Sequence, residues 1–172
     1  MKIIFLDING VLNHQLWFKE SYKKYKKCST DKEYEDSMID DSKVALLNEL
    51  IKKTNAKVVI SSSWRKEYTI KQMQTILERK GFKGEIIDST PVLSFSGIKD
   101  YKYSVPRGNE IKAWLEINKG ILGDKISKVK YVIFDDDSDM LLWQREKYFW
   151  VDPYCGLTPN IIYKAERFLL NT

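Results

Sequence analysis

Residues 2–12 read KIIFLDINGVL, and the other segments of the chain can be interpreted around this stretch. Four consecutive apolar residues, Ile3 to Leu6, are typical of a short buried strand, and the glycine-containing segment that follows indicates a loop. Asp7 lies where the strand ends. Because open α/β sheets bind their ligands at the carboxyl ends of the strands, the Asp7 carboxylate is a candidate functional group.

A β-hairpin is the alternative interpretation of the same stretch. Asn9-Gly10 between apolar residues is a strong signal for a two-residue turn. However, Val11 and Leu12 are followed directly by the polar residues 13–15, so the second apolar run is too short to pair with the first. We therefore favour a strand followed by a loop.

Length and composition indicate one soluble domain over residues 1–172, with a sizeable core and little room for a second domain. The formal charge of +5 favours anionic partners such as nucleotides or nucleic acid. Cys28 and Cys155 lie far apart, which argues for a reducing compartment and against a metal cluster of cysteines. The sequence contains no signal peptide and no apolar run of membrane-spanning length. We expect a cytoplasmic protein with no membrane contact and no obligate protein partner.

Apolar strands alternate with amphipathic helices along the rest of the chain. Further strands are predicted at 58–60, 85–87, 131–134 and 149–151, and helices at 41–54, 70–80, 107–118 and from 159 onward. Residues 13–40 read as a polar surface insertion, helical over 15–26, and 88–106 as a long irregular loop. This alternation predicts an α/β fold in which helices cover both faces of a mainly parallel sheet.

Acidic and hydroxyl side chains follow three of these strands. Asp7, Ser61 and the pair Asp135-Asp136 would meet at one edge of the sheet. Carboxylates that are forced together need a cation, and oxygen ligands without cysteine or a histidine cluster point to Mg²⁺ and a phosphate substrate. Arg107 could face the phosphoryl charge. Each residue also has a plainer explanation, as a helix cap, a surface ion pair or a solvated loop.

Five stretches in this order carry a family resemblance: FLDINGVLN, VVISSSWR, RGNEIKAWL, YVIFDDDSDM and VDPYCGLT. They resemble the haloacid dehalogenase-like phosphatase superfamily, and within it the phosphatase-like domain of Swiss-army-knife RNA repair proteins. The resemblance extends from Met1 to Phe168. It implies a Rossmann-like three-layer sandwich with a minimal cap.

The resemblance also implies roles for individual residues. Asp7 matches the nucleophile that becomes phosphorylated, Ser61 the hydroxyl of the second motif, and Arg107 the basic residue of the third motif. Asp136 and Asp135 match the metal-binding carboxylates of the fourth motif, and the sequence leaves open which of them contacts Mg²⁺.

Position 9 departs from the family pattern, which has an aspartate there. Asn9 can still offer its backbone carbonyl to Mg²⁺, but its amide cannot exchange a proton with the leaving group or water. We expect a weakened enzyme that still binds its ligand. An asparagine introduced to trap a ligand, a natural binding-only variant and a natural enzyme with another acid all remain possible explanations. We favour the first, because the other motif residues are intact.

Three more residues are candidates for substrate binding: Gly10, Ser62 and Arg65. Arg65 could contact the substrate or hold its loop in place. Trp150 could stack on a base or belong to the core.

Without a large inserted cap domain, the site should be open to bulky substrates. The favoured function is a Mg²⁺-dependent phosphomonoesterase with an aspartyl-phosphate intermediate, acting on a nucleotide or a nucleic-acid end. The alternatives are a phosphatase for a phosphorylated small molecule or phosphoprotein, and a phosphate-ligand-binding module without turnover.

Overall fold

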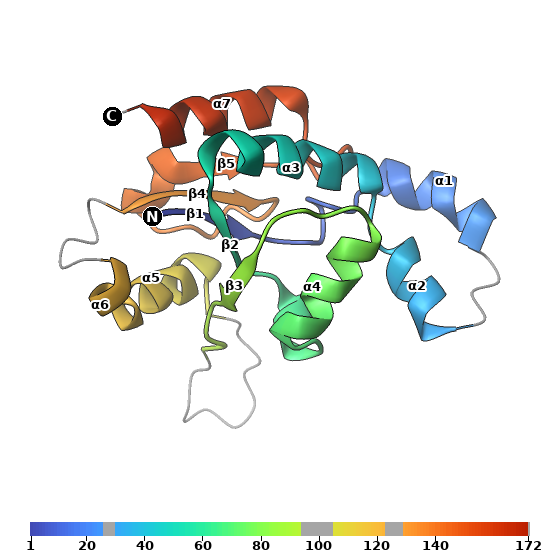
Figure 1. Cartoon of the computed structure of the whole chain (residues 1–172), viewed down its shortest axis with the longest axis horizontal. Helices are drawn as coiled ribbons and strands as arrows, with labels where there is room; N and C mark the ends of the chain where they lie inside the picture. Colours follow the sequence, from blue (N-terminus) through green and yellow to red (C-terminus); the bar gives the residue numbers. More distant parts are fainter. Residues whose placement is uncertain (26–29, 94–104, 123–128, 172) are drawn as a thin grey trace.

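A computed structural model describes residues 1–25, 30–93, 105–122 and 129–171 (Figure 1). These residues form a five-stranded sheet in the order β3-β2-β1-β4-β5, and every neighbouring pair is parallel. The strands are β1 (Lys2–Leu6), β2 (Lys57–Ile60), β3 (Ile86–Ser89), β4 (Lys130–Asp135) and β5 (Tyr148–Trp150). The predicted parallel α/β sheet is confirmed, and the hairpin alternative is excluded because β1 lies between β2 and β4 at the centre of the sheet.

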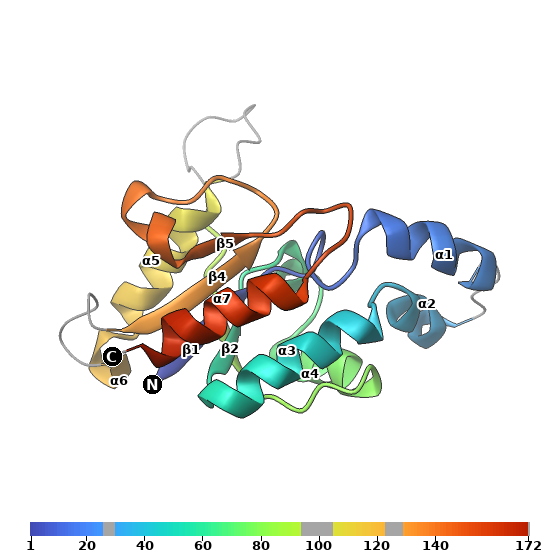
Figure 2. The ribbon, with the colours of Figure 1, turned by 90° about the horizontal axis from the view of Figure 1, so that it is seen from above.

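Helices cover both faces of the sheet, giving three layers of the Rossmann-like type (Figure 1). On one face α3 (Asp41–Thr54) and α7 (Pro159–Leu170) lie side by side (Figure 2), and α4 (Ile70–Arg79) packs into the same core cluster near β3. On the other face α5 (Arg107–Ile117) packs on the sheet and is followed by α6 (Lys119–Leu122). Within the described residues, none of the helices is long and apolar enough to span a bilayer.

The apolar run of β1 is continuous because both of its faces are buried. Ile4 and Leu6 pack into the core with α3 and α7, whereas Ile3 and Phe5 pack into the core with α5. Successive side chains of a strand point to opposite faces, so a strand with helices on both sides has no solvent-facing position to fill with a polar residue.

Several predicted helix boundaries rest on capping contacts. The Asp40 side chain accepts a hydrogen bond from the Ser42 amide at 2.8 Å and begins α3, and Asn55 ends it with φ of 55°. Thr158 caps α7, with Pro159 in its first turn.

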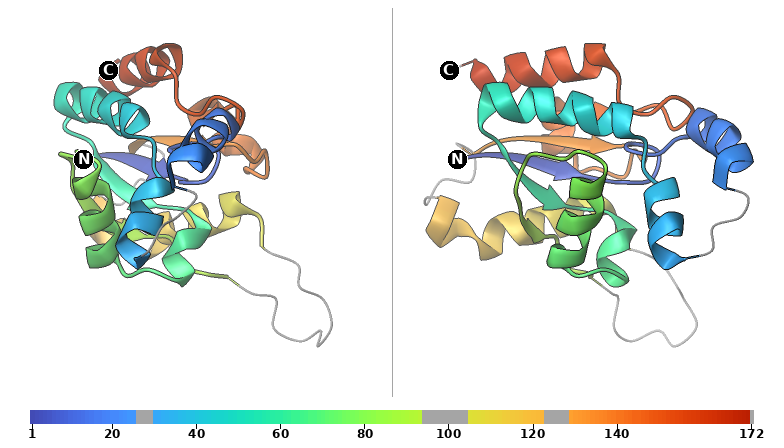
Figure 3. Two further views of the ribbon diagram at one scale, coloured as in Figure 1. Left: turned by 90° about the vertical axis from the view of Figure 1, so that its right-hand side faces the viewer. Right: turned by 45° about the vertical axis from the view of Figure 1, so that its right-hand side comes forward.

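The insertion at 13–40 contains α1 (Gln15–Tyr25) and α2 (Asp31–Ser37), which extend beyond the carboxyl edge of the sheet (Figure 3). The end predicted for the first of these helices, at Lys26, lies outside the described residues, as do residues 94–104 of the predicted long loop. His14 joins the two ends of the insertion, because its Nε2 atom lies 2.8 Å from Asp40 Oδ2 and both side chains are buried, and its Nδ1 atom lies 3.3 Å from the Tyr154 carbonyl oxygen outside the insertion. The lone histidine is thus a packing and hydrogen-bonding residue at the base of the insertion.

Candidate active site

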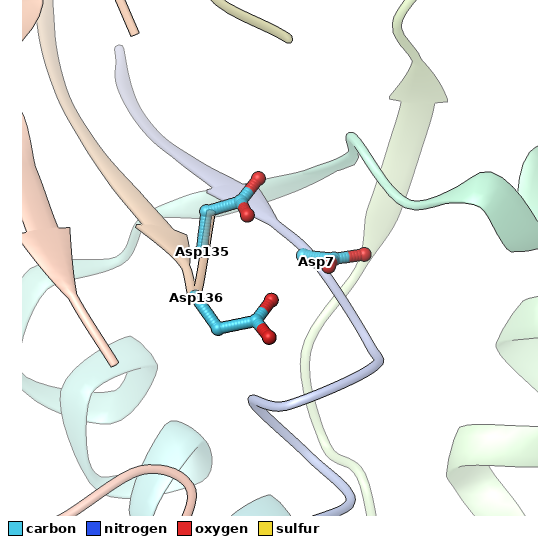
Figure 4. Close-up of side chains that lie close together, drawn as sticks. All are labelled: Asp7, Asp135 and Asp136. Carbon is cyan, nitrogen blue, oxygen red and sulfur yellow. The ribbon is translucent and has the colours of Figure 1, made fainter. Parts of the chain in front are cut away.

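Three carboxylates meet where β1 and β4 end (Figure 4). Asp7 follows β1 directly, Asp135 is the last residue of β4 and Asp136 comes next. One carboxylate oxygen from each of the three lies within 4.8 Å of the others. The register explains the meeting, since Leu6 pairs with Phe134 and the Asp7 amide donates to the Phe134 carbonyl at 3.0 Å.

The alternation of side chains along a strand also determines on which face of the sheet the site residues lie. Residues two positions before Asp7, Ser61 and Asp135 all belong to the core cluster on the α5 face, so these three side chains point to that face as well. The Ser61 amide donates to the Leu6 carbonyl at 2.9 Å, which places the serine beside the aspartates.

Arg107, the first residue of α5, brings a positively charged guanidinium group to this site. Arg107 Nε lies 3.7 Å from Asp135 Oδ2, and the Arg107 charge offsets part of the rise that burial causes in the pKa of Asp7 and of Asp135. The Arg107 amide donates to Asp139 Oδ2 at 2.7 Å, which fixes the start of α5 against the loop after β4.

Asp7, Asp135 and Asp136 form an acidic cluster. The positive charge around this cluster is too small to keep all three carboxyls ionised. Burial raises the pKa of Asp7 to about 6, against hydrogen bonds such as that from Ser62. Burial, together with the neighbouring Asp7 charge, raises the pKa of Asp135 to about 8. The pKa of Asp136 is raised mainly by burial. A bound cation would favour the ionised form of all three carboxyls.

Buried side-chain nitrogen and oxygen atoms that make no hydrogen bond lie mostly at the acidic cluster and beside it. Seven such side-chain atoms occur among the described residues, and five of them belong to predicted site residues: Asp7 Oδ1, Ser61 Oγ, Arg65 Nε, Arg107 Nε and Asp135 Oδ2. Buried polar groups are normally hydrogen-bonded. Carboxylate acceptors and neighbouring donors that lack a hydrogen bond suit a cation and an anion bound together, so the residues present fit a hard divalent metal with a phosphate.

Asn9 and Gly10 form the turn above the carboxylates. Asn9 is exposed, and its Oδ1 atom accepts from Asn13 Nδ2 at 3.1 Å and from Trp64 Nε1 at 3.2 Å. Gly10 has φ of 70°, and a Cβ atom there would lie 2.4 Å from Asp136 Cγ. Glycine is therefore required for the turn to approach Asp136 closely.

Ser62 directly precedes the short 3₁₀ helix η1 (Ser63–Lys66), and Arg65 lies within it. Arg65 is almost fully buried, donates to the Ser62 carbonyl at 2.5 Å and forms an ion pair with Glu110 of α5. Sequence reasoning missed Glu110. Its only signal was its spacing, three residues after Arg107 in RGNEIKAWL, where it also pairs with Arg107 at 2.8 Å.

One tryptophan lies at the rim of the acidic cluster. Trp150 ends β5, and its Nε1 atom donates to the Asp136 carbonyl at 2.8 Å while 53% of the residue remains exposed. The sequence left open whether Trp150 belongs to the core, and the structure places it outside the core.

Comparison with known proteins agrees with this architecture. The profile of the family described as "HAD domain in Swiss Army Knife RNA repair proteins" matches residues 3–161. Neither the curated proteins nor the solved structures contain a significant match to the chain. The matched region includes all five strands apart from Lys2 and every residue of the acidic cluster, and the chain belongs to the family of HAD domains found in Swiss Army Knife RNA repair proteins.

Proposed function

We propose that this chain is a Mg²⁺-dependent phosphomonoesterase that forms an aspartyl-phosphate on Asp7. HAD domains belong to a superfamily of phosphatase-type hydrolases, and the metal, the substrate and the intermediate are the proposal. The observation that carries it is the environment of Asp7: its buried Oδ1 has no partner among the described residues, and it lies beside two further carboxylates and close to Arg107.

Asp7, Asp135, Asp136 and the backbone carbonyl of Asn9 would hold the metal. Mg²⁺ at this position supplies positive charge to the carboxylates and to the phosphoryl oxygens.

The reaction itself would use Asp7 as the nucleophile. One Asp7 carboxylate oxygen forms a bond to phosphorus as the bond from phosphorus to the leaving oxygen breaks. The Ser61 hydroxyl and the Arg107 guanidinium donate hydrogen bonds to the phosphoryl oxygens, and Ser62 and Arg65 support them from the same loop. Attack of water on the phosphorus then releases phosphate and returns the free carboxylate.

Both steps require a proton transfer at position 9. The leaving oxygen must gain a proton in the first step, and the attacking water must lose one in the second. The amide of Asn9 does neither near neutral pH. Loss of a general acid and base typically costs about 10²- to 10⁴-fold in rate, so we expect slow turnover with intact binding.

A nucleotide or a nucleic-acid end is the proposed substrate. The formal charge of +5 favours an anionic ligand. The half-exposed Trp150 indole, held beside Asp136, offers an aromatic face on which a base can stack.

A binding module without turnover is the second candidate, and Asn9 is the observation that favours it. The same protein would then recognise a phosphorylated end without cleaving it.

Phosphate release from a panel of substrates tests the proposal. Nucleotides, end-phosphorylated oligonucleotides, a sugar phosphate and a phosphopeptide are each offered to the chain and to Asn9→Asp, with Mg²⁺ or with chelator. Mg²⁺-dependent release by Asn9→Asp, fastest on nucleotide ends, is the expected result. Ligand binding without release by either form would favour the binding module. Strong weakening of binding by salt would distinguish a polynucleotide from a mononucleotide ligand.

A further inference from the structure

Glu110 is a buried acidic residue for which the proposed chemistry has no direct use. It lies in the first turn of α5, and its side chain is 6% exposed. Its Oε2 atom accepts from Arg65 Nη2 and, at 2.8 Å, from Arg107 Nη1, while its Oε1 atom accepts from the Leu93 amide at 3.2 Å. One carboxylate thus joins the guanidinium groups of two arginines that lie 42 positions apart in sequence.

The two arginines need such a link to stay close together. The Arg65 side chain is 2% exposed and that of Arg107 is 19% exposed. Burial lowers the pKa of Arg65, and the like charge of Arg107 lowers it further, whereas Glu110 raises it. Two buried like charges repel each other strongly unless a counter-charge lies between them.

Both guanidinium groups keep a nitrogen that makes no hydrogen bond, and that of Arg107 faces Asp135 Oδ2 at 3.7 Å. Within the described residues, the buried Nε atoms of Arg65 and Arg107 have no hydrogen-bond partner. The Asp7 charge raises the pKa of Arg65, and the Arg107 charge lowers the pKa of Asp7, so both arginines act on the same carboxylate. Planar guanidinium groups held in fixed orientation are suited to bind the oxygens of a phosphate.

We propose that Glu110 is a positioning residue that holds Arg65 and Arg107 together, so that two arginines form the seat for the phosphoryl group at Asp7. This inference rests on the proposed function. It assigns to Arg65 a share in phosphate binding and to Glu110 an effect exerted only through the two arginines.

If Glu110 only neutralised the charge of the two arginines, the change in phosphate affinity on replacing it would be opposite to the change expected for a positioning residue. If Glu110 only balanced the arginines, Glu110→Gln would leave more positive charge at the site and would tighten phosphate binding. If Glu110 positions them, the same change releases both guanidinium groups from their orientation and weakens phosphate binding.

Calorimetric titration of the chain with inorganic phosphate in saturating Mg²⁺ separates these possibilities. For Glu110→Gln we expect the dissociation constant to rise roughly tenfold or more, the loss typical of one hydrogen bond to a charged group. Glu116→Gln is the matched control, because Glu116 lies on the same helix, is 49% exposed at its side chain and pairs only loosely with Lys112, at 3.9 Å. We expect no change there.

Arg65→Lys is the second variant, and it decides the matter if Glu110→Gln does not fold. Lysine keeps the charge but lacks the fork that spans Ser62 and Glu110. Phosphate binding should weaken severalfold, while Mg²⁺ affinity measured without phosphate should stay the same. Phosphate binding that is unchanged or tighter in either variant would overturn the inference. Absence of Mg²⁺-dependent phosphate binding in the unsubstituted chain would instead overturn the proposed function.

Discussion

Replacing Asn9 by aspartate should restore the missing proton transfer and increase the rate of phosphate release. The contacts of position 9 in the structure indicate how large this increase should be. Aspartate is nearly isosteric with asparagine, so the hydrogen bonds from Asn13 and Trp64 to position 9 should persist. Both donors stabilise an ionised carboxylate and lower its pKa. The protonated form that serves the first step is then scarcer at neutral pH, and the gain should fall near the lower end of the range of about 10² to 10⁴ that is typical of general acid-base catalysis. Discounted for any substitute acid that already assists the unsubstituted chain, the expected rise in rate is at least roughly tenfold.

Initial rates of phosphate release at saturating Mg²⁺ measure this gain. Asn160→Asp is the control, because it makes the same change at an exposed position in the first turn of α7. In the Asn9→Asp background, Trp64→Phe should raise the pKa of the introduced carboxyl and move the rate optimum to higher pH. A rate for Asn9→Asp that equals the rates of the unsubstituted chain and of Asn160→Asp would refute the assignment of position 9 as the acid and base.

Three further predictions concern the metal and the turn above it. Since burial raises the pKa of Asp7 to about 6 and that of Asp135 to about 8, Mg²⁺ must displace protons, and its affinity measured by calorimetry should increase from pH 6 to pH 8; an affinity independent of pH would contradict this. Gly10→Ala should abolish Mg²⁺ binding in a folded protein, because the added Cβ would lie 2.4 Å from Asp136 Cγ; circular dichroism checks the fold and titration checks the metal. Asn13→Ala should speed the deamidation of Asn9, because the Asn13 side chain accepts a hydrogen bond from the Gly10 amide at 3.0 Å and so holds the Asn9-Gly10 peptide in place. Mass spectrometry of aged samples gives the rate of deamidation, and equal rates in both forms would argue against this protection.

The strands could be predicted because their local pattern and their environment agree. β1 is an apolar run that is buried on both faces, and the run alone indicates that environment. β3 shows where the local pattern ends. The sequence predicts a strand at 85–87, whereas the structure continues to Ser89 because Asp88 and Ser89 pair with β2. Polar residues that enter a strand through pairing with a distant segment leave no local signal.

The candidate site likewise contains some residues whose position the sequence predicts and others whose position it does not. Its carboxylates follow apolar strands, so their position at one edge was predictable from the strand ends. Glu110 was not, because an acidic residue in the first turn of a helix usually faces solvent. It is buried because Arg65, in a separate segment, pairs with it. The His14–Asp40 contact was hidden for the same reason, since its partners lie 26 positions apart.

The formal charge of the assembled groups indicates what the site is built to hold. Asp7, Asp135, Asp136 and Glu110 supply four negative charges when ionised, and Arg65 and Arg107 supply two positive charges. The remaining charge of −2 equals that of one divalent cation with opposite sign. Without a cation, burial and the neighbouring carboxylates favour the protonated forms and raise the pKa values of Asp7 and Asp135. Raised pKa values mean that these carboxyls stabilise the fold below their ordinary pKa and that this stabilisation is lost as the pH rises through about 6 to 8. A divalent cation reverses that loss, so the stabilisation of the fold by metal should grow as the pH rises through about 6 to 8 and should be largest once both carboxyls are ionised.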